Sequence, residues 1–394
     1  MLVNIMEYFK NIKPKEKIII PKDNLGSMYL EDTEVLTKDG FKKMLDLKEK
    51  DEILTRYSDS SNTEWEEINT LIEDNYEGEI YWLETRYMKS PKFIPSTYLW
   101  ARPMKHGISY SDEFYYREEG NVIDALAEQC ELLEYNKYYR KPLIFTHSID
   151  LSHKEKVSTI DIGNNRYNAI DFFFWLGLVA TDGSVSKSDP VISITQCKTQ
   201  NIDIISNSMD KLFPDKWKKY EYDREKRGLS KIWHFNIYDH ELHKYVEELI
   251  GRTKIDRRLN KLFNYSHDVL ESFLDGALLG DGWNNKESNN IGIFCGISED
   301  LTKDYQVLLA FFGRRSNVLS KDERGKKSLL LSSGNYIETK NILWRISIHR
   351  ESASSVKRHH HQKENYKGKI YCPDTINELF YVRREGMSLW MSTK

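Results

Sequence analysis

The sequence predicts an α+β protein in which two similar α/β halves are inserted into an all-β domain. Three observations lead to this prediction. Two apolar helical segments each end in Asp-Gly, at Asp182-Gly183 and at Asp281-Gly282. The stretches that flank this region alternate apolar and polar residues between turn signals, as short strands do. Charge also divides the chain, because residues 1–150 carry 20 Lys and Arg against 29 Asp and Glu, whereas the remainder carries 38 against 32.

A chain of 394 residues is too long for one ordinary core, which favours two or three domains. We expect a lead-in at 1–27, an all-β domain in two pieces at 28–140 and 357–394, and the α/β region at 141–356. The cysteines form no CxxC pair, which argues against a zinc knuckle and indicates a reducing compartment; they are Cys130, Cys197, Cys295 and Cys372. We therefore expect an intracellular protein, in the cytoplasm or nucleoid of a host cell, and a viral gene fits this as well. The longest apolar run is too short for a membrane span, so no membrane partner is expected.

The first piece of the all-β domain begins with a recognisable hairpin. Residues 33–40 alternate before a Lys-Asp-Gly turn, which predicts a strand that enters a hairpin. Further strand-like runs occur at 78–84 and 92–100. The spacing of Ile, Leu and Ala from Ile123 to Leu133 predicts a helix.

The α/β region contains an internal repeat. One copy reads FWLGLVATDG at 174–183, and the other reads FLDGALLGDG at 273–282. Matching strand-like runs follow at 191–195 and 291–294, and later strands also correspond, at 233–238 and 344–349. The repeat is too long for a solenoid unit. It indicates two fused copies of one small α/β unit, at about 165–250 and 265–355.

The repeated helices bring chemistry with them. Gly177 and Gly276 leave one face of each helix without side chains, so we expect the two helices to pack closely. Gly183 and Gly282 stand where a left-handed C-terminal cap is usual. Two carboxylates at adjoining, negative helix ends repel each other and favour a divalent cation such as Mg²⁺. A single helix of this kind is usually a capped core helix, but the second copy favours a metal site at Asp182 and Asp281.

The two segments resemble the paired motifs of single-chain LAGLIDADG homing endonucleases. The resemblance covers about residues 165–355 and implies two pseudo-symmetric αββαββα halves. It also implies a β-saddle in the DNA major groove and a double-strand break that depends on two or more Mg²⁺ ions. The motif match makes Asp182 and Asp281 the catalytic metal ligands, with Gly183 and Gly282 beside the metal. Residues 257–259 and 298–313 match the basic stretch and the helix that the family places there. We expect a monomer that cuts a long, asymmetric double-stranded DNA site.

Basic residues interleaved with aromatic ones supply candidate DNA contacts. Gln196, Asn236 and Arg345 are the candidate base readers. Each lysine taken singly is as well explained as a solvated surface residue, and the accessory group beside the acids stays open between Gln196, Lys198, Lys231 and the pair at 326–327. The full set of candidates is Gln196, Lys198, Lys218, Lys219, Arg224, Lys226, Arg227, Lys231, Asn236, Arg314, Arg315, Lys326, Lys327 and Arg345.

The flanks resemble the Hint fold of inteins. Residues 29–40 resemble the N-terminal intein block, and 368–386 resemble the penultimate strands. In that register Met28 stands where an intein has the Cys or Ser nucleophile. Thr97 and Trp100 fall on the Thr-x-x-His element, with Trp in place of His, and the last residues lack the terminal His-Asn pair. These departures imply a free-standing endonuclease derived from an intein, with protein splicing lost.

Three alternatives remain open at this point. A splicing-competent intein is disfavoured by Met28 and Trp100. A non-catalytic DNA-binding protein of the same family is disfavoured by the presence of both acids. A structural β-protein with a fused helical domain does not account for the repeat.

Overall fold

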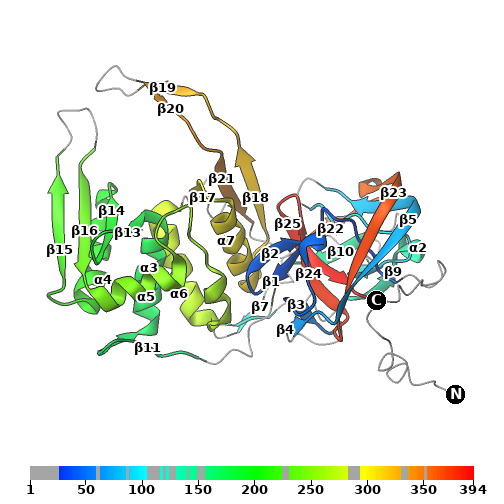
Figure 1. Ribbon diagram of the computed structural model, residues 1–394, viewed down its shortest axis with the longest axis horizontal. Helices are drawn as coiled ribbons and strands as arrows, with labels where there is room; N and C mark the ends of the chain where they lie inside the picture. Colours follow the sequence, from blue (N-terminus) through cyan, green and yellow to red (C-terminus); the bar gives the residue numbers. More distant parts are fainter. Residues whose placement is uncertain are drawn as a thin grey trace.

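The computed structural model describes residues 26–58, 63–85, 88–103, 116–118, 121–123, 130–139, 142–147, 149, 156–223, 230–282, 293–329, 336–349 and 353–394. The chain mixes helices and strands in two parts that lie side by side (Figure 1). The α/β part comprises the described residues of 156–349. The β-rich part comprises those of 26–149 and 353–394, so both ends of the described chain belong to it.

The largest sheet of the β-rich part combines strands from both ends of the chain. The predicted hairpin is present, with Thr37 opposite Gly40, whose φ of 101° requires the left-handed region that glycine tolerates. The strand β24 pairs with both β1 and β3, so the C-terminal segment is built into the N-terminal sheet. The strands are β1 (Glu34–Thr37), β2 (Gly40–Lys43), β3 (Glu52–Arg56), β4 (Thr63–Glu67), β24 (Leu379–Arg384) and β25 (Met387–Ser392).

A long two-stranded ribbon pairs β5 (Thr70–Leu83) with β23 (His361–Asp374) along the whole of both strands. It contains a second internal repeat, NYEGEIY at 75–81 and NYKGKIY at 365–371. In the register of the pair, the first tyrosine of each copy faces the glycine of the other, at Tyr76–Gly368 and Tyr366–Gly78. The glutamates of β5 form ion pairs with the lysines of β23, as in Glu77–Lys367 at 2.8 Å. The two copies are therefore complementary in charge as well as in shape.

The second sheet of the β-rich part corrects two expectations. It has the order β22 (Ala353–Val356), β10 (Leu143–Thr146), β6 (Tyr98–Pro103), β9 (Glu131–Glu134). The strands β10 and β22 therefore join the β-rich part, although they lie at the two ends of the expected 141–356 region. The helix expected at 123–133 is wrong over its last residues, which form the strand β9. Leu132 and Leu133 point to opposite faces of this strand and pack into two different hydrophobic cores. Residues 124–129 lie outside the described residues, and β8 (Asn121–Ile123) pairs with β7 (Tyr116–Glu118).

The first half of the α/β part has the element order αββαββα. Its helix α3 (Ala169–Asp182) begins at Asn168, whose side chain accepts a hydrogen bond from the Asp171 amide at 3.1 Å. Four antiparallel strands form a sheet in the order β13-β14-β16-β15, and the strands expected at 191–195 and 233–238 are present. The elements are β13 (Gly183–Val185), β14 (Val191–Gln196), α4 (Ile202–Leu212), β15 (Trp217–Tyr222), β16 (Ile232–Tyr238) and α5 (His240–Ile250), preceded by β11 (Thr159–Ile162) and β12 (Asn165–Asn168).

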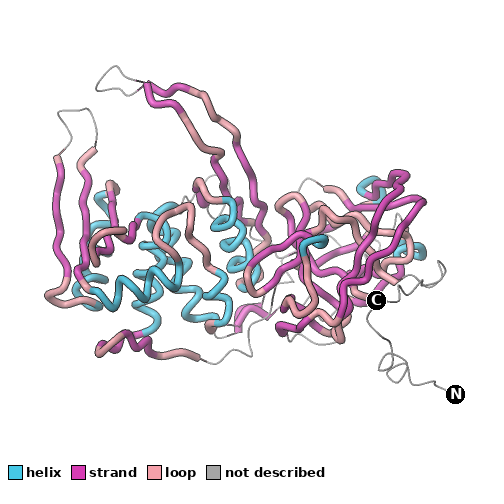
Figure 2. The backbone as a smooth tube through the Cα atoms, viewed as in Figure 1, coloured by secondary structure: helices cyan, strands magenta, loops and turns pink. Residues whose placement is uncertain are grey.

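The second half repeats the helix–strand–helix–strand order of the first, but among its described residues no helix corresponds to α5, because β22 of the β-rich part follows β21. Its sheet has the order β17-β21-β18, and residues 283–292 lie outside the description. The elements are α6 (His267–Asp281), β17 (Ile293–Gly296), α7 (Glu299–Phe311), β18 (Ser316–Lys321), β19 (Lys327–Leu329), β20 (Tyr336–Glu338) and β21 (Leu343–Ile348). The β15–β16 ribbon and the β18–β21 ribbon with its β19–β20 extension rise on the same side of the helices (Figures 1 and 2). Short helices complete the structure: α2 (Tyr135–Tyr138), η2 (Met44–Asp46), η4 (Thr199–Asn201), η6 (Asn260–Asn264) and η7 (Arg358–His360).

Buried and half-buried ion pairs hold the two parts together. Arg258 donates to Asp304 at 2.9 Å and to the backbone carbonyl of Asp39 at 2.7 Å, so it links α7 to the β1–β2 turn. Glu34 of β1 receives Lys303 at 3.1 Å and the fully buried Arg383 at 2.7 Å. In the described part of the chain no helix is both long and apolar enough to cross a membrane.

Candidate metal site and nucleic-acid surface

The helices α3 and α6 touch along their glycines. A Cβ atom on Gly177 would lie 2.1 Å from the carbonyl oxygen of Phe273, and one on Gly276 would lie 1.9 Å from that of Phe174. Both distances are far inside van der Waals contact, so only glycine permits this approach. The contact continues to the helix ends, where a Cβ on Gly280 would lie 3.2 Å from a carboxylate oxygen of Asp182. The close packing expected from the small residues is thus present, and it brings the two Asp-Gly ends together.

The glycines that follow the acids correct the expected cap. Gly183 has φ −95° and ψ 170°, and Gly282 has φ −72° and ψ 150°, so both are extended and not left-handed. Their lack of a side chain matters for another reason. A Cβ atom would lie 2.6 Å from the carbonyl oxygen of Val179 at Gly183, and 2.2 Å from that of Leu278 at Gly282. Glycine therefore lets the chain turn sharply against the last helical turn and enter the next segment.

Asp182 and Asp281 lie side by side but have different partners. Burial raises the pKa of Asp182 to about 6, and the negative charge of Asp281 adds to the shift. Gln196 of β14 donates to Asp182 Oδ2 at 2.9 Å. Lys254, which sequence reasoning missed, donates to Asp281 Oδ2 at 2.9 Å. Lys254 lies in the basic stretch ahead of α6, only three residues before the segment singled out at 257–259, so that stretch was the signal that could have identified it.

Both helix ends carry positive charge or amide donors. Arg257 is fully buried and donates to Ala180 O at 2.7 Å and to Gly183 O at 2.8 Å, at the end of α3. Lys198 donates to Gly280 O at 2.6 Å and Asn201 donates to Leu279 O at 2.8 Å, at the end of α6. These contacts offset the negative helix ends that were expected to worsen the repulsion. Lys198, a candidate DNA contact and accessory group, therefore lies beside the acids with its ammonium group at a helix end.

The donor set fits a hard divalent cation. Mg²⁺ is commonly held by one or two carboxylates together with water and substrate phosphates, and the acid pair supplies two. Within the described residues, no group of three or more His, Cys, Asp and Glu side chains could hold a metal. The carbonyl of Gly183, expected beside the metal, accepts a hydrogen bond from Arg257 and keeps a second lone pair. Asp182 and Asp281 are the candidate ligands, with Gly183 and Gly282 adjoining them.

The sheet of the first half turns one open face away from its helices. Strand register places Lys218, Asn236 and Tyr238 on this face, while Lys219 shares the opposite face with Phe235. Asn236 accepts a hydrogen bond from the Ser193 hydroxyl. The expected base reader Gln196 is 2% exposed and bound to Asp182, because the alternation of β14 turns it toward the helices.

One further candidate has a local partner, and three others lie outside the described residues. Lys231 forms an ion pair with Glu221 at 3.2 Å. Arg224, Lys226 and Arg227 lie outside the described residues.

The sheet of the second half has an open face of different composition. Arg345 lies on it, opposite Leu319, and is exposed. Lys326 and Lys327 are exposed beyond this sheet, and Lys326 forms an ion pair with Glu323 at 2.9 Å. Arg315 is 6% exposed and donates to Ser354 at 3.0 Å, so it is an interface residue and not a DNA contact as expected. Its neighbour Arg314 is half-buried behind α7.

Two of the positions expected to have lost splicing chemistry, Met28 and Thr97, are in contact. The Met28 amide donates to the Thr97 hydroxyl at 3.3 Å, and the Ser27 amide donates to the carbonyl of Lys394. Trp100 is buried and stacks on the guanidinium of Arg56, 4.4 Å from the ring centre.

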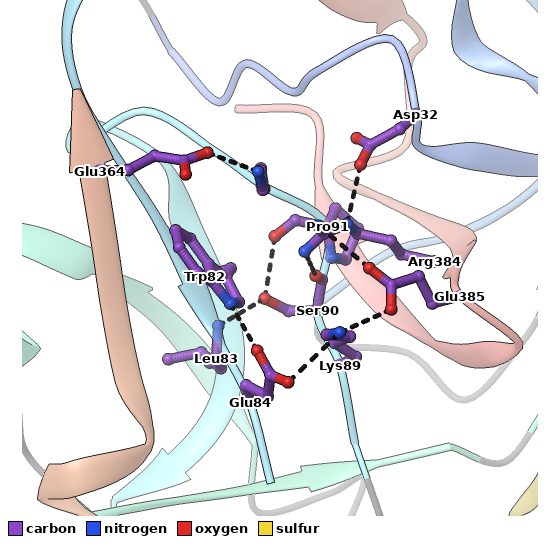
Figure 3. Close-up of polar contacts among 11 residues, drawn as sticks. Asp32, Trp82, Leu83, Glu84, Lys89, Ser90, Pro91, Glu364, Arg384 and Glu385 are labelled. Atoms are coloured by element: carbon purple, nitrogen blue, oxygen red, sulfur yellow. Dashed lines mark hydrogen bonds and ion pairs between the residues drawn. The ribbon is translucent and has the colours of Figure 1, made fainter. Parts of the chain in front are cut away.

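Asp32, within the 29–40 segment that resembles the N-terminal intein block, is held by a polar cluster (Figure 3). Arg384 donates to Asp32 at 2.9 Å and to Ser90 O at 3.3 Å, and Lys89 bridges Glu84 and Glu385. The cluster joins β24 to the 82–91 segment, so its charges serve the packing of the β-rich part.

Comparisons with known proteins give limited likenesses. No family model matches the chain. A protein of Stigeoclonium helveticum, the DNA-directed RNA polymerase subunit beta C-terminal section, is 32% identical over 99 residues, which are 24% of this chain. The chain spans only 9% of that protein's length.

Two solved structures show weak similarity. The homing endonuclease I-WcaI bound to its DNA recognition sequence has a TM-score of 0.29 at 12% identity, over 46% of this chain and 76% of that chain. A splice-inactive variant of the AceL NrdHF class 3 split intein has a TM-score of 0.19 at 16% identity, over 27% and 75%. Scores this low do not establish a shared fold.

Proposed function

We propose that this protein is a DNA endonuclease of the homing type, which makes a double-strand break with Asp182 and Asp281 as its metal-binding acids. One observation carries the proposal. Two helices in backbone contact bring two carboxylates together between two sheets whose ribbons rise on the same side of the helices. Half-buried like charges at such a place are costly without a cation, and a duplex laid across both sheets would pass over them.

Each residue of the site has a distinct task in this proposal. The two carboxylates bind Mg²⁺, which when bound lowers the pKa of water and stabilises charge on the phosphodiester. Gln196 orients the carboxylate of Asp182, and Lys254 holds that of Asp281. Arg257 and Lys198 fix the ends of α3 and α6, so the distance between the acids is set by backbone anchors. The two faces of a single chain differ, so a monomer would bind an asymmetric site of about two turns, roughly 20 base pairs.

Cleavage of random-sequence duplexes in Mg²⁺, followed by sequencing of the ends, would identify the target. On that target, Asp182→Asn and Asp281→Asn should abolish double-strand cleavage and keep DNA binding, since binding depends on many phosphate contacts. Asp203→Asn, at an exposed position in the first turn of α4, is the matched control and should cleave normally. Full cleavage by either acid variant would refute the assignment, and binding without cleavage by the wild type would favour a non-catalytic DNA-binding protein.

We also propose that the β-rich part no longer splices. Met28 offers a thioether where an attacking hydroxyl or thiol is needed, and the indole nitrogen of Trp100 has no hydrogen-bond partner among the described residues. With reporter proteins fused on both sides, residues 28–394 should yield only the unprocessed fusion on a gel. Ligated or cleaved reporter would show that the splicing register at Met28 is wrong.

A further inference from the structure

The two open sheet faces differ in chemistry. On the second half, Leu319 and Leu343 are each 37% exposed, although they lie in regular strands. Strand register places Leu319 opposite Arg345 and Leu343 opposite Lys321, so two leucines and two cations share one face. The other face of the same strands supplies the core, where Val318 and Ile346 are buried against α7. The alternation of the strands therefore points both leucines away from the hydrophobic core.

The corresponding face of the first half is built from polar groups. Tyr222 and Tyr238 are the strongly exposed large residues there, at 51% and 47%. The hydroxyls of Tyr220 and Tyr238 lie 3.4 Å apart, and Thr195 lies 3.0 Å from a ring nitrogen of His234. The aliphatic residues of this face, Val191 and Ile232, are partly buried. Hydroxyl, imidazole and amide groups thus dominate one face, whereas aliphatic and cationic groups dominate the other.

The DNA major groove offers one apolar group, the methyl of thymine, and guanine offers two acceptors that suit arginine. Burial of an exposed leucine side chain against an apolar group lowers the free energy of the complex. Arg345 forms no ion pair with any described residue, and its charge complements a nucleic acid.

We propose that the β18–β21 face reads thymine methyl groups around a guanine, while the β14–β16 face reads its half-site through polar groups. This inference rests on the proposed function. Residues two apart on a strand span about 6.8 Å, which is about two base-pair steps at 3.4 Å each. Leu343 and Arg345 therefore match a thymine and a guanine about two steps apart. The two half-sites of the target differ accordingly in their content of essential thymines.

Uracil in place of thymine tests the inference, because uracil keeps the pairing and lacks the methyl group. The full chain is bound without Mg²⁺ to the duplex obtained from the random-sequence selection. Uracil is then placed in one half-site at a time. We expect affinity to fall about fourfold for each contacted methyl in one half-site, and to change less than twofold in the other. The variant Leu319→Asn/Leu343→Asn should bind the thymine duplex as weakly as the wild type binds the uracil duplex. Uracil should not weaken its binding further.

Leu45→Asn, which changes an exposed leucine of the β-rich part, is the matched control and should bind both duplexes like the wild type. If the wild type binds and cuts its target but uracil has no effect in either half-site, the inference fails and the endonuclease assignment stands. If no duplex is bound or cut, the proposed function itself fails. If Leu319→Asn/Leu343→Asn changes the oligomeric state and leaves DNA affinity unaltered, the face serves protein contact and the inference is overturned.

Discussion

The two halves of the α/β part agree where their backbones touch and differ where a substrate would lie. Gly177 and Gly276 make equivalent contacts with the opposite helix, and both copies end in an aspartate followed by an extended glycine. Around these shared features the partners diverge, because Asp182 has the neutral Gln196 whereas Asp281 has the charged Lys254. The comparison teaches that close packing preserves a duplication, while the surrounding surface is free to specialise.

The largest expected effect tests the shared contact. Gly177→Ala and Gly276→Ala each push a methyl group into a backbone carbonyl that cannot move away, so we expect a loss of about 3 kcal/mol in the free energy of unfolding. Urea denaturation measures it. Gly296→Ala, where the nearest atom lies 4.0 Å away, should stay within about 0.5 kcal/mol of the wild type. If the two variants lose unequal amounts of unfolding free energy, the two helices do not contribute equally to the contact.

The next effect tests the difference between the acids. Lys254→Met removes the cation that contacts Asp281, so charge on the phosphate is less well stabilised and cleavage should slow about 100-fold. Because Gln196 still supports Asp182, one strand should be cut more slowly than the other, and nicked plasmid should accumulate. Lys211→Met, which removes an exposed partner of Asp171, is the control. Equal slowing of both strands would mean that the two acids act as one unit.

A smaller effect concerns the second half, which docks on the β-rich part. His147 lies 2.7 Å from the Ser354 hydroxyl, which also receives Arg315, and burial lowers the pKa of His147 to about 3, with the Arg315 charge adding to the shift. This folded pKa lies below the ordinary 6.5, so the stabilisation is complete above pH 6.5 and is lost as pH falls toward 3. Between pH 7.5 and 5.5 the loss should be about 1.4 kcal/mol.

The free energy of unfolding in urea at these two pH values measures that loss. His147→Gln cannot bind the proton, so its free energy should fall less over the same interval. Parallel pH profiles for the wild type and the variant would assign the acid sensitivity to other groups.

The smallest effect compares neighbours on one strand. Lys218 is on the open face and Lys219 on the opposite one. Lys218→Met should therefore lower the log–log slope of DNA affinity against salt by about 0.9, the value for one phosphate contact. Lys219→Met should leave the slope unchanged. If both variants alter the slope equally, DNA does not lie on the open face alone.

Features that depend on local pattern could be predicted from the sequence. The apolar segments that end at Asp182 and Asp281 are visible without a fold, and so is the packing consequence of Gly177 and Gly276. The repeat NYxGxIY at 75–81 and 365–371 was equally visible, and it predicts that two remote segments pair.

Features that depend on register or on remote partners could not be predicted. Side chains alternate between the two faces of β14, and Gln196 falls on the face that is turned toward the helices. A register shift of one residue would have exposed it. Lys254 reaches Asp281 only after α6 crosses α3, and Arg315 is buried only because the β-rich part covers it. Gly183 and Gly282 match the sequence pattern of a left-handed cap, but the crowding that makes them glycine arises from the sharp turn after each helix.

The pairing of β10 with β22 has a topological consequence. Thr146 and Ala353 face each other across the ladder, so residues 147–352 leave the sheet and return to it at the same place. To the strands on either side, the whole α/β part is the loop of a hairpin. The entropic cost of closing a loop rises only with the logarithm of its length. So long an insertion therefore destabilises the flanking sheet only slightly. A tract whose ends already meet can be gained or lost in one genetic event, and the strands that remain keep their register.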